Sequence, residues 1–154
     1  IDVGHDQLAS KLKDDPRVIN LEGINIKNPY ELNEELDLCV VDLSYISLKL
    51  TLSNILGLLC ENGIAITLFK PQFEVGKSLV GKHGVVKDLN SHVQVLNDFT
   101  AWCEENKFSI RDLTVSPIKG KNGNQEYLFF FDKAMSNTFP LEDKILEVVY
   151  GNEI

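Results

Sequence analysis

The chain has 154 residues, of which 44% are hydrophobic and 25% charged, and its formal net charge at pH 7 is −8. A chain of this length is expected to form one domain that buries roughly 70% of the surface of the unfolded chain. The composition is typical of a soluble globular protein and excludes a disordered chain. No apolar run approaches the ~20 residues that a membrane-spanning helix requires.

The three cysteines, Cys39, Cys60 and Cys103, stand far apart, each inside an apolar stretch. They form no CxxC pair and no Cys/His cluster with zinc spacing, so the sequence predicts no metal site. We expect reduced core thiols in a cytoplasmic protein, because disulfides are rare in that compartment.

Positive charge is concentrated in two segments of this acidic chain. Residues 67–87 contain four lysines against one glutamate, and residues 111–121 contain one arginine and two lysines against one aspartate. An evenly spread negative charge would repel a polyanion, so the local distribution decides whether one can bind. Both segments have the composition of loops.

The amino-terminal part is predicted to hold short elements. Residues 1–3 resemble the end of a strand, so we expect the chain to begin within a domain. Asp6 is placed to cap a helix that runs to about Leu12, and Pro16 would stop it. Residues 18–21 are a short strand candidate.

The middle of the chain alternates between strand and helix patterns. Residues 38–41 and 64–69 are apolar runs with strand composition, whereas residues 48–59 have apolar side chains at helical spacing and are followed by Asn62-Gly63, which would end the helix. Residues 71–88 contain three glycines and no periodicity. They predict a long loop, and loops of this length are commonly functional.

The carboxyl-terminal part continues the alternation. Asp88 is expected to cap a helix, residues 108–115 and 127–131 are strand candidates around a second glycine-containing loop, and an amphipathic helix is expected near residues 141–149. Strands that alternate with helices indicate an α/β fold with a mostly parallel sheet covered by helices on both faces. We expect the last strand to be antiparallel.

Ionisable residues stand where such sheets bind their ligands, beyond the carboxyl ends of the strands. Asp42 ends one strand, Lys70 ends the next, and Asp2 ends a further one. Glu126 opens the last strand. The start of an antiparallel last strand lies beside the ends of its parallel neighbours, so Asp42, Lys70 and Glu126 are expected to converge on one cleft.

Two interpretations of this cluster stay open. In the first, Asp42 caps a turn, Lys70 extends into solvent and Glu126 pairs with it. In the second, Lys70 is a partly desolvated acid–base group that the carboxylates orient; burial favours its neutral form and the carboxylates favour its charged form. Pro71 favours the second because it restricts the conformation of Lys70, although proline at the end of an edge strand also has purely structural uses.

Several blocks of the sequence resemble one known family. They are DLSYISL at residues 42–48, KPQFE at 70–74, GVV at 84–86, SPIKG at 116–120 and GNQE at 123–126, together with DVGHDQL at 2–8 and DPRV at 15–18. In this order they resemble the TlyA-type "hemolysin" family of FtsJ-like RNA methyltransferases. The resemblance runs from Ile1 to about Phe131.

The resemblance implies a Rossmann-like, S-adenosylmethionine-dependent methyltransferase that modifies a ribose 2′-hydroxyl of ribosomal RNA. The family's Lys-Asp-Lys-Glu tetrad assigns catalytic roles to Asp42, Lys70 and Glu126. The first lysine of the tetrad, the glycine-rich cofactor loop, the first strand and helix of the fold and an S4-like RNA-binding domain have no counterpart in these 154 residues. We expect them to precede Ile1.

By the same resemblance, the cofactor-binding residues are Asp2, Val3, Gly4, Asn25 and Asp42. Asp2 suits the ribose hydroxyls of the cofactor, as an acid does in dinucleotide-binding folds, and Asn25 suits the adenine. The alternatives are a frayed terminus for Asp2 and an ordinary turn residue for Asn25.

The expected partner is ribosomal RNA or a ribosomal subunit, with no membrane and no metal. Lys77, Lys82, Lys119 and Lys121 are candidates for phosphate contacts, against the alternative of solvated loops. Residues 1–133 are expected to form the methyltransferase domain and residues 134–154 a tail with a short helix. An open sheet edge would favour a homodimer.

Two other functions compete with RNA methylation. The first is an inactive, methyltransferase-like scaffold or binding module. The second is membrane lysis, which the family's historical name suggests. A lytic protein needs a strongly amphipathic cationic helix or a hydrophobic hairpin, and this acidic sequence contains neither.

Overall fold

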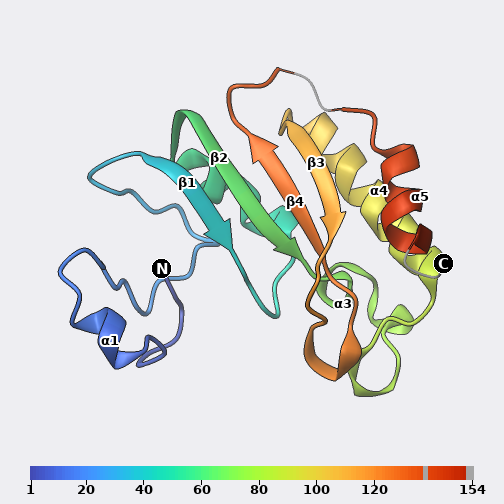
Figure 1. Ribbon diagram of the computed structural model, residues 1–154, viewed down its shortest axis with the longest axis horizontal. Coiled ribbons are helices and arrows are strands. Elements are labelled where there is room, and N and C mark those ends of the chain that lie inside the picture. Colours follow the sequence, from blue (N-terminus) through green and yellow to red (C-terminus); the bar gives the residue numbers. More distant parts are fainter. Residues whose placement is uncertain (137–138, 152–154) are drawn as a thin grey trace.

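Four strands form one mixed sheet in the computed structural model, which describes residues 1–136 and 139–151. Across the sheet the order is β1 (Leu36–Val41), β2 (Leu59–Phe69), β4 (Tyr127–Asp132) and β3 (Ile110–Val115) (Figure 1). β1 and β2 are parallel, and β4 runs antiparallel to both β2 and β3. The α/β class and the antiparallel last strand are therefore confirmed, but the sheet is mixed and not mostly parallel, with one parallel pair and two antiparallel pairs.

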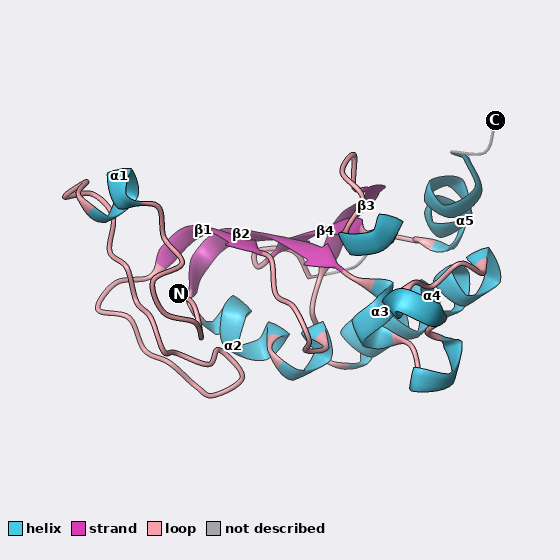
Figure 2. Ribbon diagram, turned by 90° about the horizontal axis from the view of Figure 1, so that it is seen from below, coloured by secondary structure: helices cyan, strands magenta, loops and turns pink. Residues whose placement is uncertain are grey.

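Helices cover one face of this sheet. α2 (Leu52–Gly57), α3 (Pro71–Glu74) and α4 (Leu89–Glu105) lie together on that face (Figure 2). α5 (Glu142–Tyr150) packs against α4 and β3, at the position of the expected carboxyl-terminal helix. On the opposite side, Figure 2 shows α1 and α5 only beyond the two edges of the sheet, and Leu38 and Val40 of β1 are exposed.

The expectation of helices on both faces is thus corrected. α1 (Ser10–Lys13) is the only α-helix described in residues 1–35, and it has four residues, none of them buried. Such a helix has no apolar stripe wide enough to cover a sheet.

Aromatic side chains fill the core between the sheet and α4. Phe69 of β2 and Phe129 of β4 have ring centroids 5.4 Å apart, and each ring also contacts Phe99 of α4. Residues 63–69 of β2 and all of β4 alternate between buried and half-buried, as a sheet with one covered face requires. This core holds the ends of the strands in fixed positions.

The amino-terminal segment is less regular than the sequence indicates. The strands expected at residues 1–3 and 18–21 are reduced to a single bridge between Asp2 and Glu22. The helix expected from Asp6 is the shorter α1, and its N-cap is Ala9. Asp6 has a positive φ of 57°, a left-handed conformation in which it does not act as the N-cap.

The Asn62-Gly63 pair lies inside β2 and does not end a helix, so this prediction is wrong. β2 begins at Leu59, and its pairing with β1 shifts register between Leu36 and Leu38. A Cβ at Gly63 would lie 2.8 Å from the Leu36 carbonyl oxygen, so a close backbone approach accounts for this glycine.

The helix expected after Asp88 is confirmed as α4. The Asp88 carboxylate accepts a hydrogen bond from the Ser91 amide at 2.9 Å and caps the helix. Cys103 of α4 lies in the core, whereas Cys39 and Cys60 are only half-buried. Within the ranges given above, no helix combines the length and the apolarity needed to cross a bilayer.

Candidate active site

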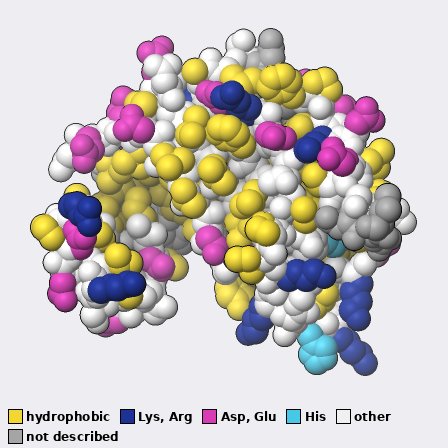
Figure 3. Space-filling model, viewed as in Figure 1, with side chains coloured by type: hydrophobic (Ala, Val, Ile, Leu, Met, Phe, Trp, Pro, Cys, Tyr) yellow, Lys and Arg dark blue, Asp and Glu magenta, His cyan; other side chains and the backbone are white. Residues whose placement is uncertain are grey.

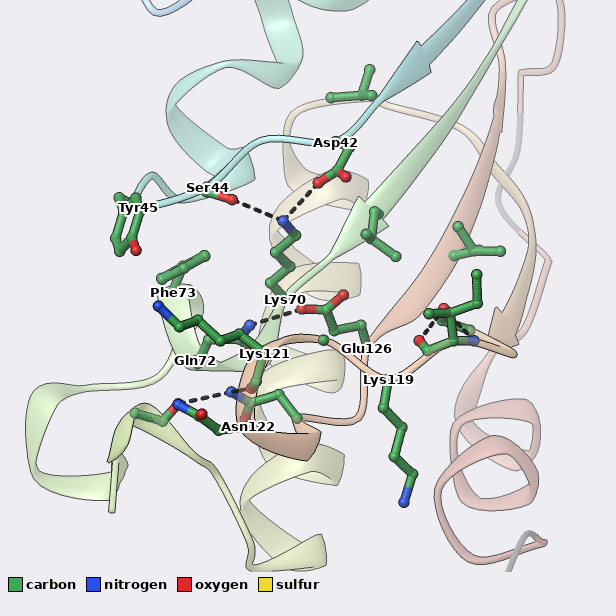
Figure 4. Close-up of a pocket in the computed structure, with 18 of the residues that line it drawn as sticks. Asp42, Ser44, Tyr45, Lys70, Gln72, Phe73, Lys119, Lys121, Asn122 and Glu126 are labelled. Carbon is green, nitrogen blue, oxygen red and sulfur yellow. Dashed lines mark hydrogen bonds and ion pairs between the residues drawn. The ribbon is translucent and has the colours of Figure 1, made fainter. Parts of the chain in front are cut away.

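The strand register brings the predicted site residues to one edge of the sheet. Phe69 pairs with Tyr127, so Lys70 and Glu126 stand next to each other where β2 ends and β4 begins. Val41 pairs with Thr67, so Asp42 follows β1 at the same edge. All three residues line one pocket of about 730 Å³ (Figure 4).

Lys70 is held by two groups from the loop after β1. Its Nζ forms an ion pair of 2.6 Å with Asp42 Oδ1 and donates a hydrogen bond of 2.9 Å to Ser44 Oγ (Figure 4). The Lys70 side chain is 11% exposed, whereas that of Asp42 is 68% exposed. Lys70 has an extended backbone, and Pro71 begins α3 directly after it. The structure therefore contradicts the first interpretation on this point, because Lys70 does not extend into solvent.

Glu126 lies in the same pocket but is held by a different residue. It is 5% exposed, and its Oε1 accepts a hydrogen bond of 2.9 Å from Gln72 Nε2. A Cβ at Gly120 would lie 2.1 Å from the same oxygen, so the loop backbone covers Glu126 closely. The expectation that both carboxylates contact Lys70 is corrected: Asp42 forms the ion pair, and Glu126 is joined to α3 by Gln72.

The two loops that surround the pocket are joined to each other. Asn124 is buried; its Nδ2 donates to the Gly84 carbonyl at 2.8 Å, and its Oδ1 accepts from the Val86 amide at 3.1 Å. Asn122 Nδ2 donates to the His83 carbonyl at 2.7 Å. Residues 81–86 and 120–124 consequently form one unit.

A buried histidine joins this unit to the core. His92 of α4 contacts the Val86 carbonyl oxygen through Nε2 and the Tyr127 hydroxyl through Nδ1, both at 2.9 Å. A carbonyl only accepts, so we assign the proton to Nε2 and expect the Tyr127 hydroxyl to donate to Nδ1. Burial raises the pKa of Tyr127, which keeps the phenol protonated.

The lysines predicted to contact RNA lie on these loops. Lys119 and Lys121 line the main pocket, and Lys82 lines a neighbouring cleft of about 720 Å³. Lys77 is exposed in a short 3-10 turn. Lysine and arginine side chains gather over this end of the molecule, at the lower right of Figure 3.

An aromatic pair stands at the rim of the pocket. The Tyr45 and Phe73 rings have centroids 5.1 Å apart, and Tyr45 is 84% exposed (Figure 4). Tyr45 also has a left-handed backbone with φ of 63°, which is unusual for an aromatic residue.

The other predicted cofactor residues lie outside this pocket. Asp2, Val3, Gly4 and Asn25 belong to the amino-terminal segment, where the Gly4 amide donates to Asp2 Oδ1 at 2.7 Å and the Ile24 amide donates to the Asp2 carbonyl at 3.0 Å. A smaller cleft of about 300 Å³ lies between this segment and β1, and Asp42 lines both this cleft and the main pocket.

Sequence reasoning missed Ser44, Gln72 and the role of Gly120. All three residues lie within the blocks that carry the resemblance, which was an available signal. The contact of Gln72 with Glu126 joins residues 54 positions apart, and the contact of Gly120 with the same carboxylate depends on how the loop folds. Neither has a local sequence pattern.

The fold and the site define an α/β protein with a carboxylate-paired lysine at the carboxyl ends of its parallel strands. A model of the FtsJ-like methyltransferase family matches residues 1–133. The 16S/23S rRNA (cytidine-2′-O)-methyltransferase TlyA of Mycobacterium tuberculosis is 37% identical over 141 residues, which are 88% of this chain and 53% of TlyA. Hemolysin A of Brachyspira hyodysenteriae is 37% identical over 134 residues, 85% of this chain and 56% of that protein.

Solved structures agree with the sequence relatives. A hemolysin-named structure from Lactococcus lactis matches with a TM-score of 0.90 and 32% identity, covering 99% of this chain and 74% of that one. A similarly named structure from Streptococcus thermophilus gives a TM-score of 0.89 and 36% identity, covering 98% and 56%. The chain therefore belongs to the FtsJ-like methyltransferase family. It spans about half the length of the curated relatives it matches.

Proposed function

We propose that this protein takes part in S-adenosylmethionine-dependent methylation of a ribose 2′-hydroxyl in ribosomal RNA. The observation that carries the proposal is the 11%-exposed Lys70, held by Asp42 and Ser44 inside a pocket that two lysine-bearing loops surround. Membership of a methyltransferase family supports the reaction class. The relative named as a 16S/23S rRNA (cytidine-2′-O)-methyltransferase supports the substrate. Ribosomal RNA as substrate would place the reaction in the cytoplasm.

Lys70 is proposed to take the proton of the 2′-hydroxyl. A neutral amine that donates its two N–H groups to Asp42 and Ser44 keeps its lone pair for a third partner. The O2′–H bond then breaks as the proton moves to Nζ, and Asp42 stabilises the ammonium that forms.

Glu126, which lines the same pocket beside Lys70, is proposed to position the substrate. Gln72 occupies one of its two carboxylate oxygens. The second oxygen is proposed to accept a hydrogen bond from a substrate hydroxyl and so to fix the ribose in line for transfer.

The methyl donor supplies a methyl group that its sulfonium already activates, so the protein has mainly to position the reactants. Asp42 lines both the catalytic pocket and the cleft beside the amino-terminal segment, which fits a donor that lies next to the reacting hydroxyl. Asp2, Val3, Gly4 and Asn25 are proposed to hold its nucleoside part. Both Asp2 and Asn25 are exposed polar residues in that segment.

Lys77, Lys82, Lys119 and Lys121 are proposed to contact RNA phosphates. All four are exposed, and they lie in or next to the two joined loops. Phosphate contacts of this kind orient the RNA and weaken as the salt concentration rises.

The direct test is transfer of a labelled methyl group to ribosomal subunits by the full-length gene product. Digestion of the RNA to nucleosides and mass spectrometry would identify the 2′-O-methyl product. We expect Lys70→Ala to reduce the rate on the order of 100-fold or more, because it removes the general base. Lys11→Ala removes a lysine from α1, far from the pocket, and is expected to leave the rate unchanged.

Equal rates for the wild type and Lys70→Ala would remove Lys70 from the mechanism. Methylation of a base in place of the ribose would contradict the proposed substrate group. Absence of transfer in the wild type, with neither donor nor RNA bound, would favour the alternative of an inactive scaffold.

A further inference from the structure

Glu74 makes a second connection between the two segments that meet at Lys70. It is the last residue of α3, and its carboxylate reaches back to the loop after β1. Oε2 accepts a hydrogen bond of 2.6 Å from Ser47 Oγ, and Oε1 accepts one of 2.7 Å from the Leu48 amide. Both oxygens are therefore used on residues 26 and 27 positions earlier in the chain.

The two connections close a ring. Lys70 stands immediately before α3 and contacts Asp42 and Ser44, whereas Glu74 stands at the end of α3 and contacts Ser47 and Leu48. The Asp42–Leu48 segment thus crosses the α3 turn and is fixed to it at both ends. The segment is fixed relative to Lys70 only while both connections are intact.

The far end of the Glu74 connection is rigid. Leu48 is 2% exposed, and Thr51, which follows in the next turn, is fully buried. Between the two ends the segment includes Tyr45 in its left-handed conformation, which local sequence does not favour and which requires support from outside the segment. The Tyr45 ring contacts Phe73 of α3, and Glu74 holds the same segment at Ser47 and Leu48.

We propose that Glu74 is a positioning residue: by holding Ser47 and Leu48 on α3, it keeps Asp42 and Ser44 in contact with Lys70. Its catalytic consequence depends on the function proposed above, whereas its structural consequence does not. Glu74 is not among the residues that line the pocket, so it acts through Asp42 and Ser44 and not on the substrate.

Two variants of Glu74 separate the effect of its hydrogen bonds from the effect of its charge. In Glu74→Gln the amide oxygen still accepts from the Leu48 amide, and the amide nitrogen donates to Ser47 Oγ, so the connection is kept without the charge. Glu74→Ala loses both bonds. Ser47→Ala leaves α3 unchanged; it loses one of the two bonds to Glu74 and also the bond that Ser47 Oγ accepts from the Lys49 amide at 3.2 Å. Glu105→Ala removes an exposed glutamate of α4 and is the matched control.

The experiment measures how fast Lys70 is acetylated by limiting acetic anhydride, with the modified lysines quantified by mass spectrometry. In the wild type we expect Lys70 to react several-fold more slowly than the exposed Lys77, because its amine is buried and bound to Asp42. Glu74→Ala should raise the Lys70 rate about three- to tenfold and Ser47→Ala by less. Glu74→Gln and Glu105→Ala should stay within twofold of the wild type, and the Lys77 rate should not change.

An unchanged Lys70 rate in a folded Glu74→Ala protein would overturn the proposal. So would a Glu74→Gln protein as reactive as Glu74→Ala, because the effect would then come from charge. If Glu74→Ala does not fold, the comparison of Ser47→Ala with the wild type decides: equal Lys70 rates refute the connection, and a raised rate supports it.

The methyl-transfer assay then separates this inference from the proposed function. In an active protein, Glu74→Ala is expected to lower kcat about tenfold or more with little change in the KM for RNA, and Glu74→Gln to restore most of it. If acetylation responds as expected and no protein transfers methyl groups, the proposed function fails while the connection through Glu74 stands.

Discussion

The lysine end of the sheet and the amino-terminal segment are built by different kinds of contact. The loops that carry Glu126 and follow Lys70 are joined through Asn124 and His92, both buried, to an aromatic core. Residues 1–35 contain exposed ion pairs, such as Lys13 with Asp6, and they are joined to α2 by the bonds that Asn54 donates to the Ile26 and Lys27 carbonyls. Their single α-helix buries none of its residues.

This difference in contacts divides the proposed site into a part held by the core and a part held at the surface. Asp42, Lys70 and Glu126 are positioned by the core before any ligand binds, which is what acid–base chemistry requires. Asp2, Val3, Gly4 and Asn25 lie in the segment held by surface pairs, which contribute little to stability. A ligand that binds this segment would therefore stabilise it by more than it stabilises the rest of the molecule.

The largest expected effect tests the aromatic core that supports the Lys70 region. Phe129→Ala removes a fully buried ring that contacts Phe69, Phe99 and Phe131, and we expect a loss of about 3–5 kcal/mol in the free energy of unfolding. Leu12→Ala in α1 should change it by less than about 0.5 kcal/mol, because Leu12 is exposed. Urea denaturation followed by circular dichroism measures both, and a similar loss in the two variants would refute the comparison.

The second-largest expected effect comes from Gly120, whose backbone lies against the Glu126 carboxylate. In Gly120→Ala the new Cβ would lie 2.1 Å from Glu126 Oε1, so either the carboxylate or the loop must move. We expect methyl transfer to fall by about 10- to 100-fold in a folded protein, because small displacements in an active site cost this much. Gly57→Ala is the control, since a Cβ at Gly57 would have no atom within 4 Å apart from its chain neighbours and the backbone of its own helix.

Gly57→Ala should keep full activity and raise the free energy of unfolding by roughly 0.5–1 kcal/mol, because Gly57 is in α2 and alanine favours a helix. Full activity in Gly120→Ala would show that Glu126 has no positional role. Loss of activity in both variants would point to a general effect of substitution.

The region around Lys70 was also easier to predict from the sequence than the amino-terminal segment. Strand composition located β1, β4 and the end of β2, and the charges at their ends identified Asp42, Lys70 and Glu126, because strand-end positions follow from local sequence and from the topology of a mixed sheet. The start of β2 was missed because Asn62-Gly63 has the composition of a helix end, whereas the tertiary contact with Leu36 fixes its conformation.

The partners within the site were less predictable. Gln72 with Glu126 and Glu74 with Ser47 join segments that are distant in sequence, and their pairing depends on the path of the backbone. The amino-terminal elements were overpredicted because residues 1–3 and 18–21 have strand composition without a sheet to join. Propensity is decisive only where packing supports it.

A smaller effect concerns the bond between the loops and the core. His92→Leu leaves the Val86 carbonyl and the Tyr127 hydroxyl buried without their partner, and we expect it to cost about 1–3 kcal/mol. Tyr127→Phe removes only one of the two bonds and should cost less. Limited proteolysis should cleave residues 76–87 faster in His92→Leu than in the wild type, and equal cleavage would show that the loop is held by other contacts.

The smallest effect is the pH dependence that Glu74 adds to stability. Burial raises the pKa of Glu74 more than the hydrogen bonds from Ser47 and Leu48 and the charge of Lys49 lower it. A folded-state pKa above the unfolded value means that the native state binds the proton more tightly, so this group's contribution is present at low pH and is lost as the pH rises through the folded pKa. The difference in free energy of unfolding between the wild type and Glu74→Gln should therefore shift against the wild type from pH 4 to pH 8. Urea denaturation at intervals across this range measures the difference, in which the other carboxylates largely cancel. A shift in favour of the wild type would mean that the bonds to Ser47 and Leu48 outweigh burial, and that the charged form of Glu74 is what holds the loop on α3.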